Sequence, residues 1–291
     1  MQAKTPKVSV VIAFLDGANF IGEAIDSVVA QSLSDWELIL VDDGSTDSSP
    51  ALARSLADSS ERVRYLAHPG GAHRGVAETR ALGSRHARGE FLVFLDHDDI
   101  LYPNALSQMA AKLDANADAS AVFACVLYWA FDPSLGATDW TSTYRGLGNG
   151  LTSGRRVLRS LIRSDAYHPA NCSTLYRRRV YCELRDAGPL YPGMYEETAI
   201  LFRLLASHDV YLLDRPVAAY RMHSESMCQR ALAAGTLSNR GYSEDRSRFL
   251  DWASENVPMD TLSRAQLALV RTWFGLHKRL RRSPADSSAA C

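Results

Sequence analysis

The sequence predicts an α/β protein in which a mostly parallel sheet is flanked by helices. Short apolar runs rich in β-branched and aromatic residues, typical of strands buried on both faces, alternate with amphipathic stretches of helical spacing. This alternation is typical of a parallel sheet with helical crossovers. Two of the apolar runs end abruptly in acidic residues, which places charged side chains at an edge of the predicted sheet.

The first half of the chain alternates regularly between the two kinds of segment. Pro50 suits the first turn of a helix, and Gly89 ends the helix that precedes the central strand. The expected strands are residues 8–14, 36–41, 63–66, 91–95 and 119–128, and the expected helices are residues 19–30, the segment after Pro50, residues 75–87 and the segment after Pro103.

The pattern loosens between residues 129 and 192, where Gly, Ser, Thr, aromatic and Arg residues replace the regular apolar spacing. Such a segment is typical of a lid or a substrate-facing region. Regular elements return beyond it, and the last third is helical. The expected elements there are a helix at 197–207, strands at 210–213 and 217–220, and helices at 246–252 and 262–280.

The composition, with 46% hydrophobic and 22% charged residues, is ordinary for a globular protein. Lys and Arg total 32 against 33 Asp and Glu, so no basic field suggests a nucleic acid, and we predict no nucleic-acid partner. The five scattered cysteines favour free thiols in a reducing compartment. The first residues look like a strand rather than a signal peptide, and no apolar run reaches the roughly 18 residues of a membrane span. These features predict a cytoplasmic protein.

Three acidic residues, Asp96, Asp98 and Asp99, follow directly on the apolar run 91–95. Carboxylates packed this closely repel one another and are costly to remove from water. They are therefore expected at the exit of a strand, where a cation neutralises them. Strand ends are also where open α/β sheets bind ligands.

A second acidic strand end lies at Asp42 and Asp43, and in a parallel sheet it would open onto the same edge. Helix capping is the alternative explanation for such residues, and we accept it for Asp47 and Ser48. A metal flanked by carboxylates at a sheet edge commonly holds a diphosphate, because the cation leaves coordination positions open for phosphate oxygens. The sequence therefore predicts a divalent metal, Mn²⁺ or Mg²⁺, at this edge.

Four segments carry a family resemblance, and they occur in the expected order. They read VSVVIAF, VVAQSLSDWELILVDDGSTD, GVAETRALGSRHARGEFLVFLDHDDILYP and YEETAILFRL. Together they resemble glycosyltransferase family 2, the inverting transferases with the GT-A fold, over approximately residues 8–221. The resemblance implies a GT-A (Rossmann-like) fold, with a mixed, mostly parallel sheet flanked by helices.

The same resemblance implies a division of the chain into parts. Residues 1–225 would form the GT-A catalytic domain, in which residues 1–128 bind the nucleotide sugar and residues 129–225 bind the acceptor. Residues 226–282 would form a helical C-terminal extension. Residues 283–291, polar and rich in small side chains, are expected to be a disordered tail.

The resemblance assigns donor-binding residues at the first strand ends and on the third helix. Asp43 is similar to the family's aspartate that accepts a hydrogen bond from the nucleotide base, and a carboxylate suits the imide N–H of uracil. Ala13, Phe14 and Asp16 would line the base pocket, although many members have a proline, an aromatic ring and an asparagine in this stretch. Arg80 is similar to the family's arginine near the donor phosphates or the acidic cluster, and a surface helix arginine is the alternative.

Asp96, His97 and Asp98 stand in the place of the family's Asp-x-Asp. The resemblance implies that Asp98 is the direct metal ligand and that Asp96 and His97 support the metal and the donor. Asp99 would orient its neighbours or cap the next helix. His223, in YRMHSESM, is similar to a family histidine that reaches the metal or the diphosphate, and a structural or solvated histidine is the alternative.

Glu196 and Glu197 occupy the place of the family's Glu-Asp pair, whose second member is the general base. A base is required because a sugar hydroxyl is a poor nucleophile until its proton has an acceptor. We therefore predict Glu197 as the base, with Glu196 as the alternative because Glu is longer than Asp. Two glutamates at the start of a helix are also favoured by its dipole alone. Residues 168–174 stand where the family places acceptor contacts, and an exposed turn is the alternative.

These residues together predict a metal-dependent inverting glycosyltransferase. It would move a sugar from a nucleoside diphosphate donor, expected to be a UDP-sugar, to a hydroxyl of a glycan or lipid-linked acceptor in cell-surface polysaccharide synthesis. A catalytically silent sugar-nucleotide-binding subunit is the alternative. A phosphoacceptor signalling domain is disfavoured because it has no use for the glutamate pair, and a nicotinamide dehydrogenase because no G-x-G-x-x-G follows the first strand.

The last expected helix, residues 262–280, allows two interpretations. One face is apolar, and five cations gather towards its end: Arg271, Lys278, Arg279, Arg281 and Arg282. Through residues 262–282 the protein would make a peripheral contact with the inner face of the cytoplasmic membrane. The alternative is a terminal helix that packs on the domain and leaves a solvated basic end.

Overall fold

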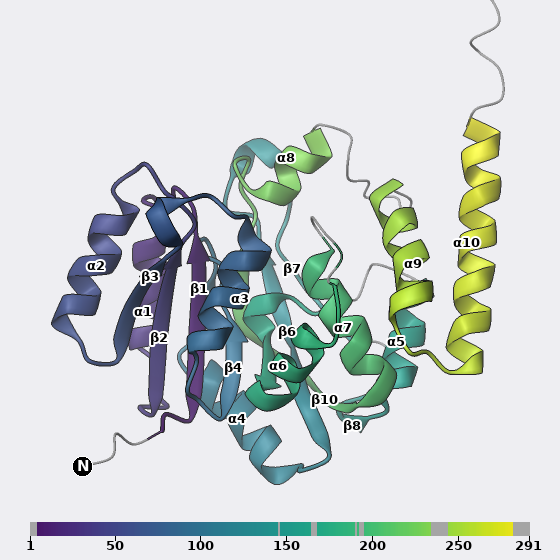
Figure 1. The fold of residues 1–291 in the computed structure, drawn as a ribbon, viewed down its shortest axis with the longest axis horizontal. Helices are drawn as coiled ribbons and strands as arrows, with labels where there is room; N and C mark the ends of the chain where they lie inside the picture. The colour runs from purple at the N-terminus through teal and green to yellow at the C-terminus, as the bar shows by residue number, and fades with distance from the viewer. Residues whose placement is uncertain are drawn as a thin grey trace, which may run out of the picture.

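A mixed sheet runs through the molecule, and helices cover both of its faces (Figure 1). The computed structural model describes residues 5–144, 146–163, 168–189, 191, 195–233 and 244–281. In these residues the sheet has ten strands, in the order β3-β2-β1-β4-β9-β6-β10-β5, with β7 paired to β6 and β8 paired to β10. The predicted mostly parallel α/β architecture is confirmed.

The first half of the chain forms the parallel part of the sheet and its crossover helices. The bounds are β1 Val8–Phe14, α1 Ile21–Val29, β2 Trp36–Asp42, α2 Ser49–Ser59, β3 Val63–Ala67, the 3₁₀ turn Pro69–Gly71, α3 Val76–His86, β4 Phe91–Phe94, β5 Ile100–Leu101, α4 Ala105–Ala115 and β6 Ala119–Trp129. Strands β3, β2, β1 and β4 are parallel neighbours. Each predicted element of this half is present, with ends that differ by at most two residues.

The second half adds antiparallel strands and a layer of helices. The bounds are the 3₁₀ turn Pro133–Leu135, β7 Trp140–Thr141, β8 Gly150–Thr152, α5 Gly154–Arg163, the 3₁₀ turn Asn171–Ser173, β9 Thr174–Arg177, α6 Arg178–Asp186, α7 Glu196–Ser207, β10 Asp209–Arg221, α8 Met227–Ala233, α9 Glu244–Asn256 and α10 Thr261–Arg281. The expected tail at residues 283–291 lies outside the described residues.

The region between residues 129 and 192 is more regular than the sequence predicts. It contains α5 and α6, because each has an apolar face hidden among arginines: Val157, Leu158, Leu161 and Ile162 of α5 are buried. The two short strands expected at 210–213 and 217–220 are one strand, β10. A shift of register around Pro216 separates the two apolar runs.

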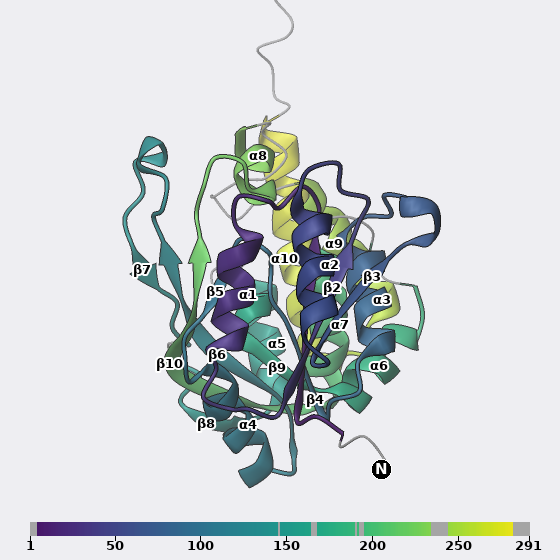
Figure 2. The same cartoon turned by 90° about the vertical axis from the view of Figure 1, so that its left-hand side faces the viewer.

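Each face of the sheet has its own core, as alternation along a buried strand requires. Val10 and Ile12 of β1 lie in a cluster with α1 and α4, while Val11 lies in the opposite cluster with α5 and α7. Figure 2 shows α1 in front of the sheet, beside the rising arm that β6 and β7 form. The helices therefore hold the strand ends in fixed positions.

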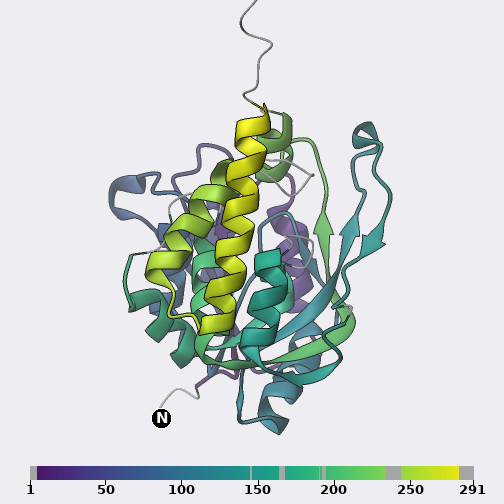
Figure 3. The ribbon, with the colours of Figure 1, turned by 90° about the vertical axis from the view of Figure 1, so that its right-hand side faces the viewer.

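The C-terminal helices belong to the second of these cores. Figure 3 shows α10 lying beside α9 and α5. Phe249 of α9 and Leu267 and Phe274 of α10 are buried in the cluster that contains α5 and α7. Among the described residues, no helix has both the length and the apolar composition that crossing a bilayer demands.

Candidate active site

The two acidic strand ends meet at one edge of the sheet. Strands β2, β1 and β4 are parallel neighbours, and their carboxyl ends point towards the upper edge in Figure 1. Phe14 pairs with Asp42, and the Leu95 N–H donates to the carbonyl of Val11, so Asp43 and Asp96 follow the two strands that flank β1 at this edge. The register of the three strands thus brings both acidic strand ends to the same edge of the sheet, as the sequence predicts.

The end of β1 is tied to the loop that follows β2. Asp16 has a left-handed backbone, with φ of 49°, and its Oδ1 accepts hydrogen bonds from the N–H groups of Thr46 at 2.7 Å and Asp47 at 3.3 Å. Ala13 and Phe14 are buried, and the carbonyl of Phe14 accepts from the Asp43 N–H at 2.9 Å. These residues build the loop around Asp43, and the ring of Phe14 lies in the core.

Asp43 lies under the loop that leads into α3. Its Oδ1 accepts from the N–H of Arg74 at 2.7 Å, its Oδ2 accepts from the N–H of Gly75 at 3.0 Å, and His73 Nδ1 lies 2.9 Å from Oδ2. The carboxylate is 3% exposed. Oδ1 also accepts from the N–H of Gly75 at 3.1 Å, so the carboxylate holds the start of the loop before α3.

Arg80 joins the carboxylate of Asp96 to those of the two glutamates. Its Nη2 donates to Asp96 Oδ1 at 2.5 Å, and its Nη1 lies 3.6 Å from Glu196 Oε1 and 3.7 Å from Glu197 Oε1. When the side-chain amide of Asn171 is turned so that its oxygen faces the guanidinium, that oxygen accepts from Nη2 at 3.0 Å and from Nη1 at 3.3 Å. Burial disfavours the charge of Arg80, but the carboxylates of Asp96 and Glu197 outweigh it and raise the pKa of Arg80.

A glycine lets α3 carry Arg80 into this position. A Cβ at Gly83 would overlap the side chain of Val11, so α3 packs directly on β1 only because that atom is absent. Arg80, three residues earlier, is then held against the edge of the sheet, where it is 8% exposed. The alternative of a surface helix arginine does not apply.

The two glutamates begin α7, and both are mostly enclosed. The side chain of Glu196 is 6% exposed and that of Glu197 is 15% exposed. Burial and the neighbouring Glu197 raise the pKa of Glu196 to about 8, against the influence of Arg80. Burial also raises the pKa of Glu197, and Arg80 opposes this shift. Glu196 Oε1 and Glu197 Oε2 are buried without a hydrogen-bond partner among the described residues.

Asp98 is paired with His223 from the end of β10. His223 Nε2 lies 3.0 Å from Asp98 Oδ2, and its ring packs against Phe20 at 4.7 Å between centroids. Burial alone would raise the pKa of Asp98, but the hydrogen bond with His223 and the nearby His97 lower it. The ring of His97 packs close to Gly17, where an added Cβ would lie 2.7 Å from its Cδ2.

Asp99 has a structural place in the turn. Its Oδ1 accepts from the Arg221 N–H at 3.0 Å, and α4 begins only after Asn104, so Asp99 does not cap that helix. Burial and the charges of Asp98 and Asp96 raise the pKa of Asp99 well above its usual range. These contacts fit a role for Asp99 in orienting its neighbours.

The side chains at the end of β4 suit a hard divalent cation that keeps some coordination positions open for other ligands. Among the described residues, no group of three His, Cys, Asp or Glu side chains converges in metal-ligating geometry. Asp98 and His223 are adjacent, and Asp96 is bound by Arg80. Mg²⁺ and Mn²⁺ sites that hold substrate phosphates commonly take one or two protein ligands, so this set fits such an ion.

A family model described as glycosyl transferase family 2 matches residues 9–184 of the chain. The chain belongs to this family. The resemblance to this family is therefore confirmed, and the match ends before the fourth segment, YEETAILFRL.

Several relatives with curated descriptions are named as glycosyltransferases. The putative glycosyltransferase EpsH of Bacillus subtilis is 27% identical over 78% of this chain and 64% of its own length. An uncharacterized glycosyltransferase of Rickettsia prowazekii is 36% identical over 35% of this chain, and the match spans only 30% of that protein.

Two solved structures of other proteins share the fold of this chain. Residues 1–349 of Staphylococcus aureus TarS in complex with UDP-GlcNAc are similar over 96% of this chain and 74% of that one, with a TM-score of 0.66 at 17% identity. The mannosyltransferase PcManGT of Pyrobaculum calidifontis, in complex with GDP-Man and Mn²⁺, is similar over 96% and 86%, with a TM-score of 0.52 at 17% identity. At these identities the comparison shows the GT-A fold.

The family resemblance assigns no individual role to two residues of the site, Arg221 and Asn171. Arg221 stands inside the quoted YRMH segment, but only its histidine was assigned a role. Asn171 belongs to the segment 168–174, which was named as a whole. Each of them acts through contacts with residues far away in the chain, Asp98 for Arg221 and Arg80 for Asn171.

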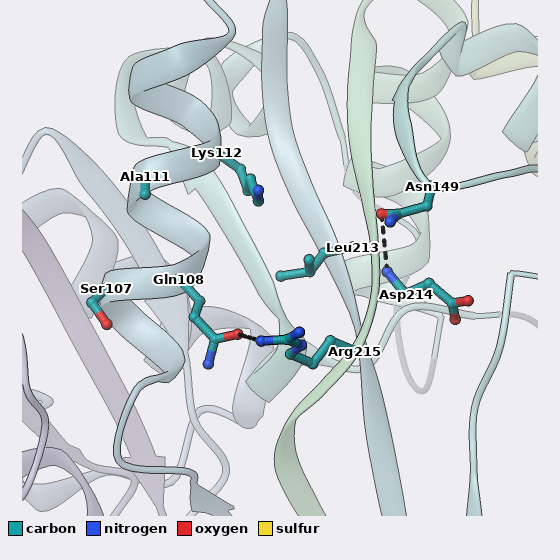
Figure 4. Close-up of a pocket in the computed structure, with 8 residues that line it drawn as sticks. All are labelled: Ser107, Gln108, Ala111, Lys112, Asn149, Leu213, Asp214 and Arg215. Atoms are coloured by element: carbon teal, nitrogen blue, oxygen red, sulfur yellow. Dashed lines mark hydrogen bonds between the residues drawn. The ribbon is translucent and has the colours of Figure 1, made fainter.

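A separate cavity of about 450 Å³ lies between α4 and β10 (Figure 4). Arg215 Nη1 donates to Gln108 Oε1 across it at 3.4 Å, and the Asp214 N–H donates to Asn149 Oδ1 at 3.3 Å. None of the predicted site residues lines this cavity. The acidic edge, with its converging charges, remains the candidate active site of this family 2 member.

Proposed function

We propose that the protein transfers a sugar, with inversion, from a nucleoside diphosphate sugar to a hydroxyl of a glycan or lipid-linked acceptor. The observation that carries the proposal is the position of Arg80 between Asp96 and the glutamate pair. One guanidinium thereby connects the carboxylates expected beside the donor diphosphate with those expected beside the acceptor hydroxyl.

The residues divide the reaction between them. Asp98 and His223, with Asp96 beside them, would hold Mn²⁺ or Mg²⁺, which when bound stabilises the charge on the departing diphosphate. Glu197 accepts the proton of the acceptor hydroxyl. The hydroxyl oxygen forms a bond to the anomeric carbon from the face opposite the leaving nucleoside diphosphate. The bond from that carbon to the phosphate oxygen breaks, so the nucleoside diphosphate leaves with the electron pair.

Glu197 suits the role of base better than Glu196. A pKa of about 8 keeps Glu196 mostly protonated at neutral pH, so its carboxyl group cannot accept the proton of the acceptor hydroxyl. The side chain of Glu197 is the more exposed of the two. Arg80 opposes the rise of both pKa values, but only the pKa of Glu196 is raised further by the neighbouring glutamate. The protonated Glu196 would then act as a neutral neighbour that limits the negative charge beside the base.

The donor is expected to carry uridine, and Asp43 is the residue proposed to read the base. The solved relatives that support a nucleotide-sugar donor are TarS with UDP-GlcNAc and PcManGT with GDP-Man. The assembly of a cell-surface polysaccharide is part of the proposal. The description of EpsH as a putative glycosyltransferase supports the sugar transfer alone. The proposal retains residues 1–225 as the catalytic domain, whose core α9 and α10 share.

A peripheral membrane contact through α10 is a further part of the proposal, for a protein that works at the inner face of the cytoplasmic membrane. Leu262, Leu269 and Trp273 are spaced by seven and four residues, so they share one face of α10, and all three are exposed. Leu267 and Phe274 are buried on another face. The basic side chains at positions 278–282 lie outside the described side chains.

Binding of nucleoside diphosphates tests the proposal and separates it from the silent-subunit alternative. We expect UDP with Mn²⁺ to raise the melting temperature of the protein, and EDTA to reduce this shift. We also expect slow release of UDP from UDP-sugars by the wild-type protein and not by Glu197→Gln. Binding without any release by the wild type would favour a sugar-nucleotide-binding subunit, and no shift with any nucleoside diphosphate would contradict the proposed function.

A further inference from the structure

Arg221, the last residue of β10, is fully buried and touches the turn that carries Asp98. Its side chain is 1% exposed. Its backbone N–H donates to Asp99 Oδ1 at 3.0 Å, and its Nε donates to the carbonyl of Asp98 at 2.8 Å. Its Nη2 donates to Glu23 Oε2 at 2.6 Å, which ties α1 to the same residue. One side chain thus connects three separate segments of the chain.

Aromatic rings surround the guanidinium. Its central carbon lies 4.9 Å from the ring centroid of Phe20, 4.8 Å from that of Trp129 and 4.5 Å from that of Phe131. Such positions over aromatic faces are attractive for a cation. Nη1, however, is buried without a hydrogen-bond partner among the described residues. Stability alone does not explain this arginine, because apolar residues often replace buried ion pairs at no cost.

The end of β10 holds Asp98 in two ways. Arg221 fixes the backbone of the turn through the Asp98 carbonyl and the Asp99 carboxylate. His223, two residues later, meets the Asp98 carboxylate itself. Phe20 packs against both side chains, so Arg221 and His223 occupy one connected group. A substitution of Arg221 would therefore remove the side-chain contact that holds this turn, while each residue proposed to bind the metal stays unchanged.

We propose that Arg221 is a positioning residue, which fixes the turn at residues 98 and 99 so that the Asp98 carboxylate faces the cation and the donor diphosphate. This inference rests on the proposed function. Residues that orient ligating side chains commonly change metal affinity by about 10- to 100-fold when they are removed. The rings of Phe20, Trp129 and Phe131 exclude water from the guanidinium. Its hydrogen bond to the turn is stronger because water is absent.

The test measures Mn²⁺-dependent UDP binding by calorimetry in Arg221→Met and Arg221→Lys. We expect Arg221→Met to weaken UDP binding in the presence of Mn²⁺ by about 10- to 100-fold and to leave the weaker metal-free binding of UDP within about twofold. Lysine keeps the charge but cannot form the forked contacts of arginine, so Arg221→Lys should fall between the two. Wild-type affinity in a folded Arg221→Met protein would overturn the inference.

Arg246 supplies a matched control for the loss of a buried arginine. It is 3% exposed, lies 5.6 Å from the ring centroid of Phe274 and donates to the carbonyl of Leu161 at 3.2 Å, on the C-terminal side of the molecule. Arg246→Met should lower the melting temperature without changing the Mn²⁺-dependent affinity for UDP. An equal loss of affinity in Arg246→Met would mean that Arg221 acts through general stability, which overturns the inference.

Two milder variants keep the test decisive if Arg221→Met does not fold. Glu23 is 60% exposed at its side chain and Phe131 is 40% exposed, so Glu23→Ala and Phe131→Ala should both fold. Each loosens the hold on Arg221, and we expect each to weaken Mn²⁺-dependent UDP binding by about two- to tenfold, less than the full removal. Wild-type affinity in both contradicts the inference. A wild-type protein that binds neither UDP nor GDP with Mn²⁺ contradicts the proposed function itself.

Discussion

Arg80 Nη2 lies 2.5 Å from Asp96 Oδ1, and this contact joins α3 to the end of β4. Because the same guanidinium is almost fully buried, removing it leaves the carboxylates without their compensating charge. We expect Arg80→Met to lower the free energy of unfolding by about 3 to 5 kcal/mol, as the loss of one partner of a buried ion pair does. Denaturant unfolding followed by circular dichroism measures this change.

Arg80→Lys should recover only part of this stability, since lysine cannot contact Asp96 and the glutamates at once. Arg62 is the matched control, because its guanidinium stacks on Trp36 at the surface. Arg62→Met should change the free energy of unfolding by less than about 1 kcal/mol. If Arg80→Met is as stable as Arg62→Met, the position of Arg80 between the carboxylates has no energetic consequence.

The pKa of Glu196 predicts how stability depends on pH. The folded protein holds the Glu196 proton up to about pH 8, whereas the unfolded chain releases it near the ordinary value of 4.5. The stabilisation from this proton is thus complete below about pH 4.5 and is lost as pH rises towards about 8, with a slope of at most about 1.4 kcal/mol per pH unit.

Glu196→Gln carries no such proton, so its melting temperature relative to wild type should rise with pH. Between about pH 5.5 and about pH 9 the difference should increase by several degrees, given that about 1 kcal/mol corresponds to about 2 to 4 °C in a chain of this size. Melting curves of both proteins across this range measure it. A difference that stays constant with pH would contradict the raised pKa.

Asp43→Asn should weaken nucleotide binding and also destabilise the loop before α3, because its amide nitrogen would face the N–H of Gly75. Asp43→Asn keeps an oxygen for the N–H of Arg74 but lacks the charged acceptor proposed for the base. Hydrogen bonds to charged groups contribute about 1.5 to 3 kcal/mol, so UDP binding should weaken by about 10- to 100-fold. Calorimetry with UDP tests this, with Asp58→Asn on exposed α2 as control. Equal affinities in the two variants would remove Asp43 from the base site.

The buried side chains of α10 change how the membrane contact must be tested. A chain shortened near Asp260 loses Leu267 and Phe274 from the core, so it would unfold as well as lose the helix. The sharper variant carries Leu262→Gln, Leu269→Gln and Trp273→Gln on the exposed face. We expect it to float less than wild type with anionic liposomes, because these side chains are the apolar surface available for the membrane.

The control for flotation carries polar substitutions at exposed leucines elsewhere. Leu52→Gln and Leu151→Gln should float like wild type, since both leucines lie outside α10. Added salt should reduce flotation of the wild type if the basic end of α10 contributes. Flotation of the α10 variant that equals that of the control would exclude the membrane contact through this face.

The buried strands and their acidic ends could be predicted because their signals are local. The apolar run 91–95 and the carboxylates that follow it are adjacent in the sequence, and a parallel sheet brings such ends to one edge. Helices α5 and α6 were missed because arginines interrupt their apolar faces. Their burial depends on α7 and the sheet, which no local pattern encodes.

The connections within the site depend on contacts between distant residues. Arg221 and Glu23 are separated by 198 positions, and Arg80 meets Glu196 only because Gly83 lets α3 lie against β1. The family resemblance indicated Arg80 and His223 but did not indicate which carboxylates they would meet. Sequence reasoning therefore names most of the proposed site residues, and the tertiary structure shows how Arg80 and Arg221 connect them.

The rate of nucleoside diphosphate release in Asp98→Asn tests the central claim most directly. Wild type and variant are incubated with Mn²⁺ and UDP-GlcNAc, UDP-glucose or GDP-mannose, and the released diphosphate is quantified, with Asp58→Asn as control. We predict release by wild type and by Asp58→Asn, and a loss of about 100-fold or more in Asp98→Asn, because the cation that stabilises the leaving group loses its carboxylate ligand. Release by Asp98→Asn at the wild-type rate would contradict the account.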